Sequence, residues 1–473
     1  MMNWLAFGSE LYYFLALIVF TVMAMLPHPN PRREFTAALF LSAVGMAVCI
    51  AGVRSEGLLF AGTYSVDLYS QIFKVMLSMG VFLIICICAN LDGVAKKYHA
   101  EFYLCLFTSA MAMMMLASAV HLLTIYVALE LSSYSLYILV VMNRRQESGL
   151  EAGLKYFLVG VVASAVMLFG LAILYGSIRA TYLSEIVQVI PAVIDQPLVI
   201  IGLLLSLGGF LFKLAVFPFH FWAPDVYQGA PNQVAAFIAS ASKVAAIAIL
   251  VRFMAMSGGG SVYLAHALVA LAIVSMTVGN LAAIVQKDFN RLMAYSSIAH
   301  AGYVLIGILC MDTAGYTSAI FYGLSLMLMK FTCFLVLVKV STDGGSLQID
   351  QLAGLHRRSP LLAMALMLAL FGLAGIPPTI GFTGKLLVFI AAMQNGYGIL
   401  VLIAMINVVI SLYYYLLVVK AAYLLEPTQE QPPLAVSPAV KVLAAALVTA
   451  MIVIGIYPTH FLALVHEAAR LLV

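Results

Sequence analysis

Six ionisable side chains lie inside stretches of sequence that are otherwise almost wholly apolar, and their types suit proton transfer. A carboxylate and a lysine amine can each take up and release a proton, and burial makes a lysine release its proton more readily. Each charge placed deep in a bilayer costs roughly 2.5–3.5 kcal/mol, so such residues indicate a function or a set of partners. Two histidines at similar depth join them, and the set is Glu130, Lys155, Lys213, Lys243, Lys330, Lys385, His220 and His300.

Glu130 is the only acidic residue placed deep within a predicted membrane span, while Lys74 is counted with the flank of a connection. On a helix, the face that carries Glu130 also carries the residues at i+3, i+4 and i+7, which are Ser133, Tyr134 and Tyr137. This spacing predicts a polar stripe on an apolar helix. A purely structural glutamate paired with a lysine is the plainer alternative.

Lys213 and Lys385 each lie beside a predicted interruption of a helix. Lys213 precedes Pro218, and Lys385 follows Pro377 and Pro378 in a stretch rich in glycine. Proline removes a backbone donor and frees a carbonyl, so both helices are expected to break. Broken spans in corresponding halves of a chain indicate an ion site near the middle of the membrane. Alternatively, the two lysines only cap the freed carbonyls.

Other candidates have equally plain alternatives. Lys155 lies one turn inside the end of its span, where a lysine often extends its amine to the surface. Lys243 and Lys330 lie near the middle of their spans and are harder to explain in this way. His220 and His300 could be packing histidines with satisfied hydrogen bonds.

The composition of the chain requires a membrane environment. Of its 473 residues 64% are hydrophobic and 9% are charged, and the mean hydropathy is +1.10. Water-soluble proteins are roughly 45–50% apolar and about 25% charged, so a soluble enzyme and a nucleic-acid binder are excluded. The net charge of +4 is too small to indicate a polyanionic partner. An all-α polytopic membrane protein remains.

Cofactor motifs are missing from the sequence. The six cysteines form no CxxC pair and no Cys/His cluster with metal-ligand spacing, and no glycine-rich nucleotide-binding motif occurs. We therefore expect this chain to hold no metal or other cofactor and to carry no electrons. Its first ten residues contain no Lys or Arg, which predicts a membrane span and not a cleaved signal peptide.

About 20 apolar residues cross a bilayer as a helix, and on this basis fourteen spans are predicted. The stretch 177–196 and a short amphipathic helix in the tail 459–473 are expected to lie along the membrane surface. The predicted spans are 4–26, 35–53, 70–90, 102–119, 121–142, 152–176, 197–217, 232–256, 262–284, 291–310, 313–340, 360–395, 397–425 and 438–458.

The distribution of basic residues predicts the orientation. Connections after odd-numbered spans carry thirteen Lys and Arg residues, Arg144 and Arg145 among them, whereas connections after even-numbered spans carry four. Cytoplasmic connections are the richer ones in Lys and Arg, so both termini are expected to face the periplasm.

Two halves of the chain correspond. Ser132-Ser133 recurs as Ser296-Ser297 at an offset of 164. Further correspondences are proposed between Lys155 and Lys330 and between Lys213 and Lys385. Five helices separate the members of each pair, which predicts two inverted five-helix repeats, each with a broken helix. The predicted parts are 1–101 (helices 1–3), 102–256 (first repeat), 262–425 (second repeat) and 438–473 (helix 14 and tail).

Five stretches resemble the antiporter-like subunits of respiratory complex I, and most closely the subunit N group of bacterial NADH-quinone oxidoreductases. They are ALELSSYSLYIL (128–139), EAGLKYFLVG (151–160), FKLAVFPFHFWAPDVYQGAP (212–231), KDFNRLMAYSSIAHAGY (287–303) and LAGIPPTIGFTGK (373–385).

The resemblance implies a subunit of the membrane arm that translocates protons in a bacterial inner membrane. The flavin, iron–sulfur clusters and quinone would then belong to partner subunits, with the lipid bilayer and protons as the other partners. The family's proton path would map onto Glu130, Lys155, Lys213, His220, Lys243, His300 and Lys385, to which the depth of Lys330 adds a further candidate.

We hypothesise that a carboxylate about 4 Å from a buried lysine offsets the cost of burying its charge, so that movement of Glu130 relative to Lys213 would switch the lysine between holding and releasing a proton. The proton would pass on to Lys243, His300 and Lys385. Alternatives are a subunit of a multisubunit cation/proton antiporter or of a ferredoxin-dependent relative, a solute transporter, and a structural membrane anchor.

Overall fold

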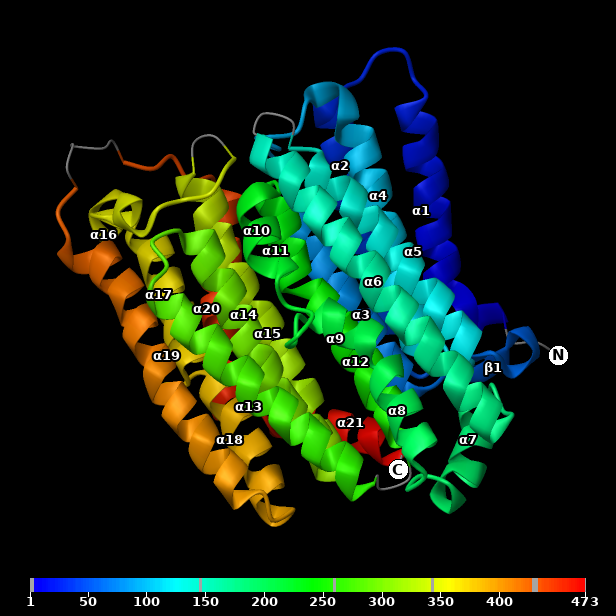
Figure 1. Ribbon diagram of the computed structural model, residues 1–473. Coiled ribbons are helices and arrows are strands. Elements are labelled where there is room, and N and C mark those ends of the chain that lie inside the picture. The colour runs from blue at the N-terminus through cyan, green and yellow to red at the C-terminus, as the bar shows by residue number, and fades with distance from the viewer. Residues whose placement is uncertain (1–3, 144–146, 258–260, 342–343, 428–432, 473) are drawn as a thin grey trace.

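The computed structural model describes residues 4–143, 147–257, 261–341, 344–427 and 433–472. It consists almost entirely of helices that run side by side, as expected for an all-α membrane protein (Figure 1). The first part contains α1 (Gly8–Ala24), α2 (Pro31–Ala51), α3 (Leu68–Cys86) and a small hairpin of β1 (Gly57–Leu59) and β2 (Tyr64–Val66). The short 3-10 helices of this part are η1 (Trp4–Phe7), η2 (Phe60–Gly62) and η3 (Lys96–Tyr98).

The region predicted as the first repeat contains nine helices and one 3-10 helix among its described residues. They are α4 (His99–Ser118), α5 (Leu122–Val141), α6 (Glu147–Ile178), α7 (Leu183–Val189), η4 (Ile190–Ala192), α8 (Pro197–Ser206), α9 (Gly208–Leu214), α10 (Trp222–Gly229), α11 (Asn232–Ala239) and α12 (Ala241–Ala255).

The remaining part begins with α13 and ends with a short helix in the tail. Its elements are α13 (Val262–Ile284), α14 (Phe289–Ile308), α15 (Thr313–Val340), η5 (Ile349–Leu352), α16 (Leu355–Arg358), α17 (Pro360–Ala374), α18 (Ile380–Gln394), α19 (Gly398–Leu424), α20 (Pro438–Ile456) and α21 (Thr459–Arg470).

Eleven segments of the described residues are long and apolar enough to cross a membrane, so the multi-pass prediction is confirmed. Three predicted spans are not among them. The span 4–26 corresponds to α1, which has only 17 residues, and 360–395 is divided between α17 and α18. The span 291–310 corresponds to α14, which is long enough but more polar. That the chain crosses the membrane fourteen times therefore stays a prediction.

The two predicted helix breaks are present and have the same backbone design. The residues that follow α9 and α17, Ala215 and Gly375, are both in the left-handed conformation. The next amide in each case, that of Val216 or Ile376, donates to the carbonyl five residues earlier. Pro218 and Pro378 follow three residues after the left-handed residue. The two breaks therefore match at an offset of 160.

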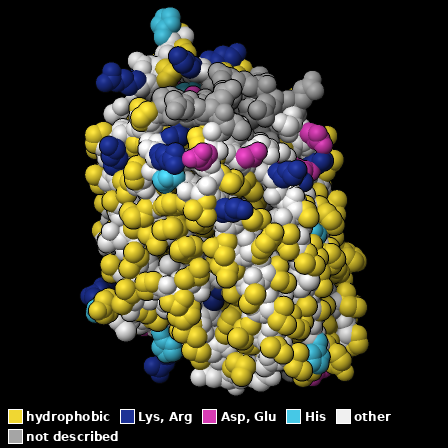
Figure 2. All heavy atoms as spheres, turned by 90° about the vertical axis from the view of Figure 1, so that its left-hand side faces the viewer, with side chains coloured by type: hydrophobic (Ala, Val, Ile, Leu, Met, Phe, Trp, Pro, Cys, Tyr) yellow, Lys and Arg dark blue, Asp and Glu magenta, His cyan; other side chains and the backbone are white. Residues whose placement is uncertain are grey.

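Basic side chains mark one end of the molecule, which we call the basic end. Arg32, Lys96, Arg291 and Arg357 lie there, at the top of Figure 1 beside the starts of α2, α4, α14 and α17. Figure 2 shows Lys and Arg gathered toward this end, above a broad hydrophobic band. Both chain termini lie away from the basic end (Figure 1). Arg144 and Arg145, which contribute to the predicted orientation, lie outside the described residues.

The innermost helices are α11–α12 and α15, whose apolar windows are wholly buried. Around them, α13 packs on α14 and α19, and α6 packs on α5, α8 and α10. The amphipathic tail helix is present as α21, which lies against α15 with Val465 and Ala468 buried. This arrangement places the predicted site residues of α9, α12, α14 and α15 in the interior.

One buried ion pair was not predicted. Lys74 Nζ of α3 lies 2.7 Å from Glu10 Oε1 of α1, and both side chains are almost fully buried. Tyr64 donates a hydrogen bond to the same carboxylate oxygen. The pair was not among the candidates because these were chosen by their depth within a predicted span. The pair escapes sequence analysis because its members lie near the ends of different helices, at positions that look accessible.

Candidate functional site

Lys213 is bound to a serine of α5 and not directly to Glu130. Its Nζ donates to Ser132 Oγ at 2.7 Å, and this hydroxyl donates in turn to the carbonyl of Leu129. The Glu130 carboxylate accepts a hydrogen bond from Ser164 of α6. Among the described residues, no ion pair within 4.0 Å joins Glu130 to Lys213. The expected direct contact at about 4 Å is therefore absent, although the two charges interact electrostatically.

The polar stripe predicted around Glu130 is only partly formed. Ser133 bonds back to the carbonyl of Leu129, and Tyr134 is about half exposed on the outer surface. Tyr137 is buried. The contribution of α5 to the site is therefore mainly Glu130 and Ser132.

Lys243 of α12 connects to Lys213 through the backbone. Its Nζ donates to the carbonyl oxygen of Lys213 at 3.1 Å and lies 5.1 Å from the ring centroid of Trp222. This carbonyl belongs to the last turn of α9, where it has no partner within the helix. Lys243 therefore caps the broken helix and lies next to Lys213.

A continuous chain of hydrogen bonds begins at Lys330 of α15. Lys330 Nζ donates to Ser296 Oγ at 2.7 Å, and Ser296 bonds to the hydroxyl of Tyr415. The Tyr415 hydroxyl lies 3.0 Å from His300 Nε2, and His300 Nδ1 lies 2.6 Å from the Tyr322 hydroxyl. All five side chains are buried. Helices α14, α15 and α19 together hold this chain, which we call the His300 chain.

Lys385 caps the second broken helix. Its Nζ donates to the carbonyls of Leu373 at 2.7 Å and Ala374 at 3.1 Å, at the end of α17, and lies 5.0 Å from the ring centroid of Tyr303. Lys385 therefore makes the contacts that the alternative of a lysine capping the freed carbonyls predicts. This alternative does not describe the contacts of Lys213, whose amine binds a serine.

The contacts correct the proposed correspondence between lysines. At the offset of 160 that matches the two breaks, Lys213 corresponds to Leu373 and not to Lys385. The carbonyl of Lys213 accepts from Lys243, and the equivalent carbonyl of Leu373 accepts from Lys385. Each of these two amines lies over an aromatic ring. We call Lys243 and Lys385 the break-capping lysines.

The other two buried lysines form a second matching pair. Lys213 donates to Ser132 and Lys330 donates to Ser296, and these serines belong to the motif that recurs at an offset of 164. Lys330, which was proposed to match Lys155, thus has the contacts of Lys213. We call Lys213 and Lys330 the serine-bound lysines.

Lys155 lies apart from the buried row. Its side chain is 45% exposed, and its Nζ lies 2.7 Å from carboxylate oxygens of both Glu151 and Asp225. Asp225 also accepts from Arg291 Nη1 at 2.6 Å. Partial burial raises the pKa of Asp225, but the hydrogen bonds from Lys155 and Arg291 outweigh it and hold that pKa below its usual value. This network joins α6, α10 and α14 at the basic end.

His220 follows the first break and is buried beside the rings of Phe217 and Phe221. Its Nδ1 atom has no hydrogen-bond partner among the described residues. The structure brings together Lys213, Lys243, Lys330, His300 and Lys385, and it leaves His220 and Lys155 outside their hydrogen bonds.

Several polar side chains of the site were not predicted. Ser164, Tyr322 and Tyr415 come from helices whose sequences give no sign of what they face, because tyrosine and serine are common in membrane helices. Ser132 and Ser296 were noted only as markers of a repeat. A search for hydroxyl groups on helices predicted to pack beside each buried lysine could have found them. Within the described residues, no group of three or more His, Cys, Asp or Glu side chains could hold a metal ion.

Two broken helices and a buried row of lysines in a multi-pass membrane fold define the class of antiporter-like membrane subunits. The family profile described as NADH:quinone oxidoreductase/Mrp antiporter, transmembrane, matches residues 119–411. A curated protein from Syntrophobacter fumaroxidans, "NADH-quinone oxidoreductase subunit N 2", is 59% identical over 471 residues and covers all of both chains. The chain belongs to this family, and it is similar in sequence to proteins named NADH-quinone oxidoreductase subunit N.

Solved structures agree with this assignment. A chain of respiratory complex I from Thermus thermophilus, solved with bound aureothin, is 34% identical, and the match covers 96% of this chain and 98% of that one with a TM-score of 0.84. A chain of the Mrp complex from Dietzia sp. has a TM-score of 0.89, covers 100% and 98%, and is 22% identical, which shows the fold alone.

Proposed function

We propose that this chain is a proton-translocating subunit in the membrane arm of an NADH-quinone oxidoreductase, and that its buried lysines and the His300 chain carry the protons. The observation that carries the proposal is the unbroken series of hydrogen bonds from Lys330 to Tyr322. A structural anchor would not need five ionisable or hydroxyl groups in hydrogen-bond contact in its interior. A solute transporter would need a polar cavity of substrate size in place of a row.

The order of the route follows from neighbouring charges. Lys213 interacts electrostatically with Glu130, and Lys243 interacts with both serine-bound lysines, Lys213 and Lys330. His300 interacts with Lys330 and Lys385. The proposed sequence is therefore Glu130, Lys213, Lys243, Lys330, His300 and Lys385.

The His300 chain can pass a proton without moving a heavy atom far. The Lys330 ammonium gives a proton to the Ser296 hydroxyl, which releases its own proton to Tyr415, and Tyr415 does the same toward His300 Nε2. His300 then releases the proton on Nδ1 toward Tyr322. Ser296, Tyr415 and His300 each gain one proton and lose one, while Lys330 loses one and Tyr322 releases its own proton toward Lys385. The chain resets when Lys330 takes up a proton from Lys243, the hydroxyls rotate and the His300 tautomer is restored.

Glu130 would act as the switch at the start of the route. The Glu130 carboxylate accepts a hydrogen bond from Ser164 and not from Lys213, so the structure represents the state in which Glu130 and Lys213 are apart. Approach of the two charges would favour the protonated lysine, and separation would release the proton toward Lys243. Redox chemistry in partner subunits would drive this movement, with flavin, iron–sulfur clusters and quinone bound there.

The direct test is proton pumping by inverted membrane vesicles that contain the whole complex. Lys330→Ala should lower acidification per NADH oxidised, whereas Lys420→Ala, which removes an exposed lysine, should not. Normal pumping by an assembled Lys330→Ala complex would show that the His300 chain is structural. The subunit composition of the purified native complex would separate this proposal from a cation/proton antiporter, which has no flavin or iron–sulfur subunits, and from a ferredoxin-dependent relative.

We further infer that the chain lies in a bacterial inner membrane with fourteen spans, two inverted repeats and both termini in the periplasm. The predicted basic bias supports this orientation. A reporter fused after Val473 that is active only outside the cytoplasm tests it. Activity of a cytoplasmic reporter at that position would require an odd number of spans.

A further inference from the structure

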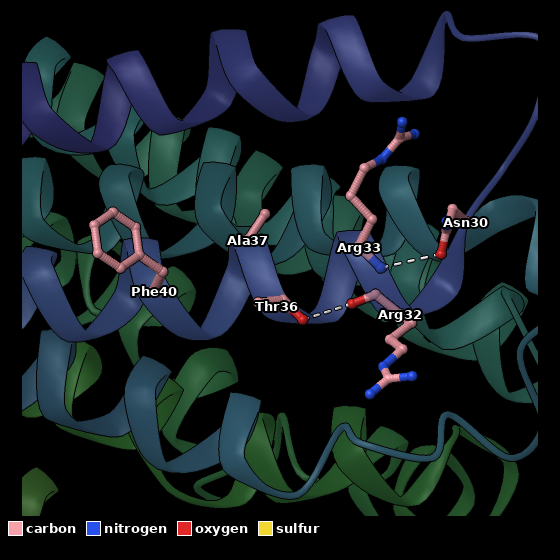
Figure 3. Close-up of a pocket in the computed structure, with 6 residues that line it drawn as sticks. All are labelled: Asn30, Arg32, Arg33, Thr36, Ala37 and Phe40. Carbon is pink, nitrogen blue, oxygen red and sulfur yellow. Dashed lines mark hydrogen bonds between the residues drawn. The ribbon is translucent and has the colours of Figure 1, made fainter.

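A shallow cavity of about 510 Å³ lies on the outer surface of α2 at the basic end, far along the chain from the proposed proton route. Figure 3 shows that its lining comes entirely from the first three turns of α2 and the residue before it. The lining residues are Asn30, Arg32, Arg33, Thr36, Ala37 and Phe40.

The free donors of this cavity are the two guanidinium groups and the Asn30 side-chain amide. Asn30 Oδ1 accepts from the Arg33 amide at 3.1 Å, and the Thr36 hydroxyl donates to the Arg32 carbonyl at 2.8 Å, so both are occupied within the helix (Figure 3). Neither guanidinium forms an ion pair with any described residue. The nearby Glu34 is fully buried and accepts from the Asn30 amide, so it does not neutralise the surface.

More positive charge lies next to the cavity. Lys96 and Lys97 of η3 are exposed, and Lys96 shares a neighbouring cavity with Pro31, the first residue of α2. Four exposed basic side chains therefore lie at this end, with the exposed Asp92 beside Lys96.

The character of the surface changes along the helix. Phe40 is 66% exposed and lies seven residues beyond Arg33, about 10 Å further into the hydrophobic band at 1.5 Å per residue. An occupant must therefore be anionic at one end and apolar at the other. An anionic phospholipid has this form, with an anionic headgroup for the guanidinium groups on either side of α2 and an acyl chain for Ala37 and Phe40.

We propose that this face of α2 is a binding site for an anionic phospholipid, whose headgroup lies between the guanidinium groups of Arg32 and Arg33, which extend to either side of the helix (Figure 3). Inorganic phosphate would satisfy the guanidinium groups but would leave Phe40 exposed, so a lipid is the better fit. Bound lipid would fix the block of α1–α4 relative to the membrane surface.

The experiment uses the whole purified complex in nanodiscs of phosphatidylcholine that contain a small fraction of photoactivatable phosphatidylglycerol. After illumination, peptides of α2 are searched for lipid adducts. The variant R32Q/R33Q should lower labelling on the order of tenfold, since each basic residue near a membrane surface adds appreciably to anionic lipid binding. R32K/R33K keeps the charge and should retain most of the labelling.

The matched control is K420Q/K441Q, which removes two exposed basic side chains elsewhere and should leave labelling of α2 unchanged. Excess inorganic phosphate should also leave it unchanged. Native gels establish that each variant assembles. Equal labelling of the wild type and R32Q/R33Q, equal labelling by photoactivatable phosphatidylcholine, displacement by inorganic phosphate, or adducts to a neighbouring subunit in place of lipid would each overturn the proposal.

Discussion

Among the residues that the structure describes, Tyr415 alone links Ser296 to His300, and Tyr415→Phe removes this link with the loss of one oxygen atom. The substitution leaves His300 Nε2 without its hydrogen-bond partner in a buried position, at a cost of about 1–3 kcal/mol. The space of one hydroxyl is smaller than the roughly 30 Å³ that a water molecule occupies in the liquid, so water should not readily replace the lost group. We expect the complex to assemble but to pump fewer protons per electron.

The assay compares acidification by inverted vesicles with the rate of NADH oxidation in the same preparation. The control is Tyr69→Phe, because Tyr69 is also fully buried and its hydroxyl donates to the Ala248 carbonyl at 2.6 Å, outside the His300 chain. Tyr415→Phe loses two buried hydrogen bonds, to Ser296 and His300, and Tyr69→Phe loses one, so both should lower stability and Tyr415→Phe should lower it more. Only Tyr415→Phe should lower the ratio of protons to electrons.

Two outcomes would refute the reasoning. If assembled Tyr415→Phe retains the wild-type ratio, the proton does not pass through the Tyr415 hydroxyl. If Tyr69→Phe lowers the ratio as much as Tyr415→Phe does, the effect reflects a general loss of packing and not a broken route.

Three further predictions concern the ends of the route and the surface network. Glu130→Ala and Lys213→Ala should each lower proton pumping by roughly fivefold or more. The double variant should pump little worse than either single variant, because both residues act on one step. Additive losses of pumping in the vesicle assay would contradict this. Asp225→Asn should lower the thermal stability of the complex by about 1 kcal/mol or less, since Lys155 and Arg291 are partly exposed; an unchanged melting temperature would show that the network contributes nothing. The pKa of Asp225 is lowered in the folded state, so its contribution is complete above about pH 4 and is lost as the pH falls further; a stability difference from Asp225→Asn that disappears between pH 8 and pH 5 would contradict this sign.

The features that sequence predicted well are those fixed by local chemistry. Long apolar runs must form helices in a bilayer, because every backbone group must be satisfied internally. The breaks were predictable because Pro218 and Pro378 cannot continue a helical ladder. The depth of each lysine followed from its distance to the ends of its span. All of these properties depend on a stretch of fewer than 20 residues.

Contacts between helices could not be predicted in the same way. Whether Glu130 faces Lys213 or Ser164 depends on the rotation of three helices about their axes, and one turn of a helix offers several possible partners. The same uncertainty hid Tyr322 and Tyr415, which meet His300 from α15 and α19. It also hid the pair of Glu10 and Lys74, since an ion pair between distant helices leaves no local pattern.

The difference between the two halves explains why only one of them needs a long hydrogen-bond chain. In the first half, the carbonyl that Lys243 caps belongs to Lys213 itself, so the serine-bound and the break-capping lysines are direct neighbours. In the second half the equivalent carbonyl belongs to Leu373, whose side chain carries no proton, and Lys330 lies on a different helix. No hydrogen bond among the described residues joins Lys330 to Lys385, and His300 lies beside Tyr303, over whose ring the Lys385 amine lies. In the proposed route, the imidazole and its two tyrosine partners therefore supply the step between Lys330 and Lys385.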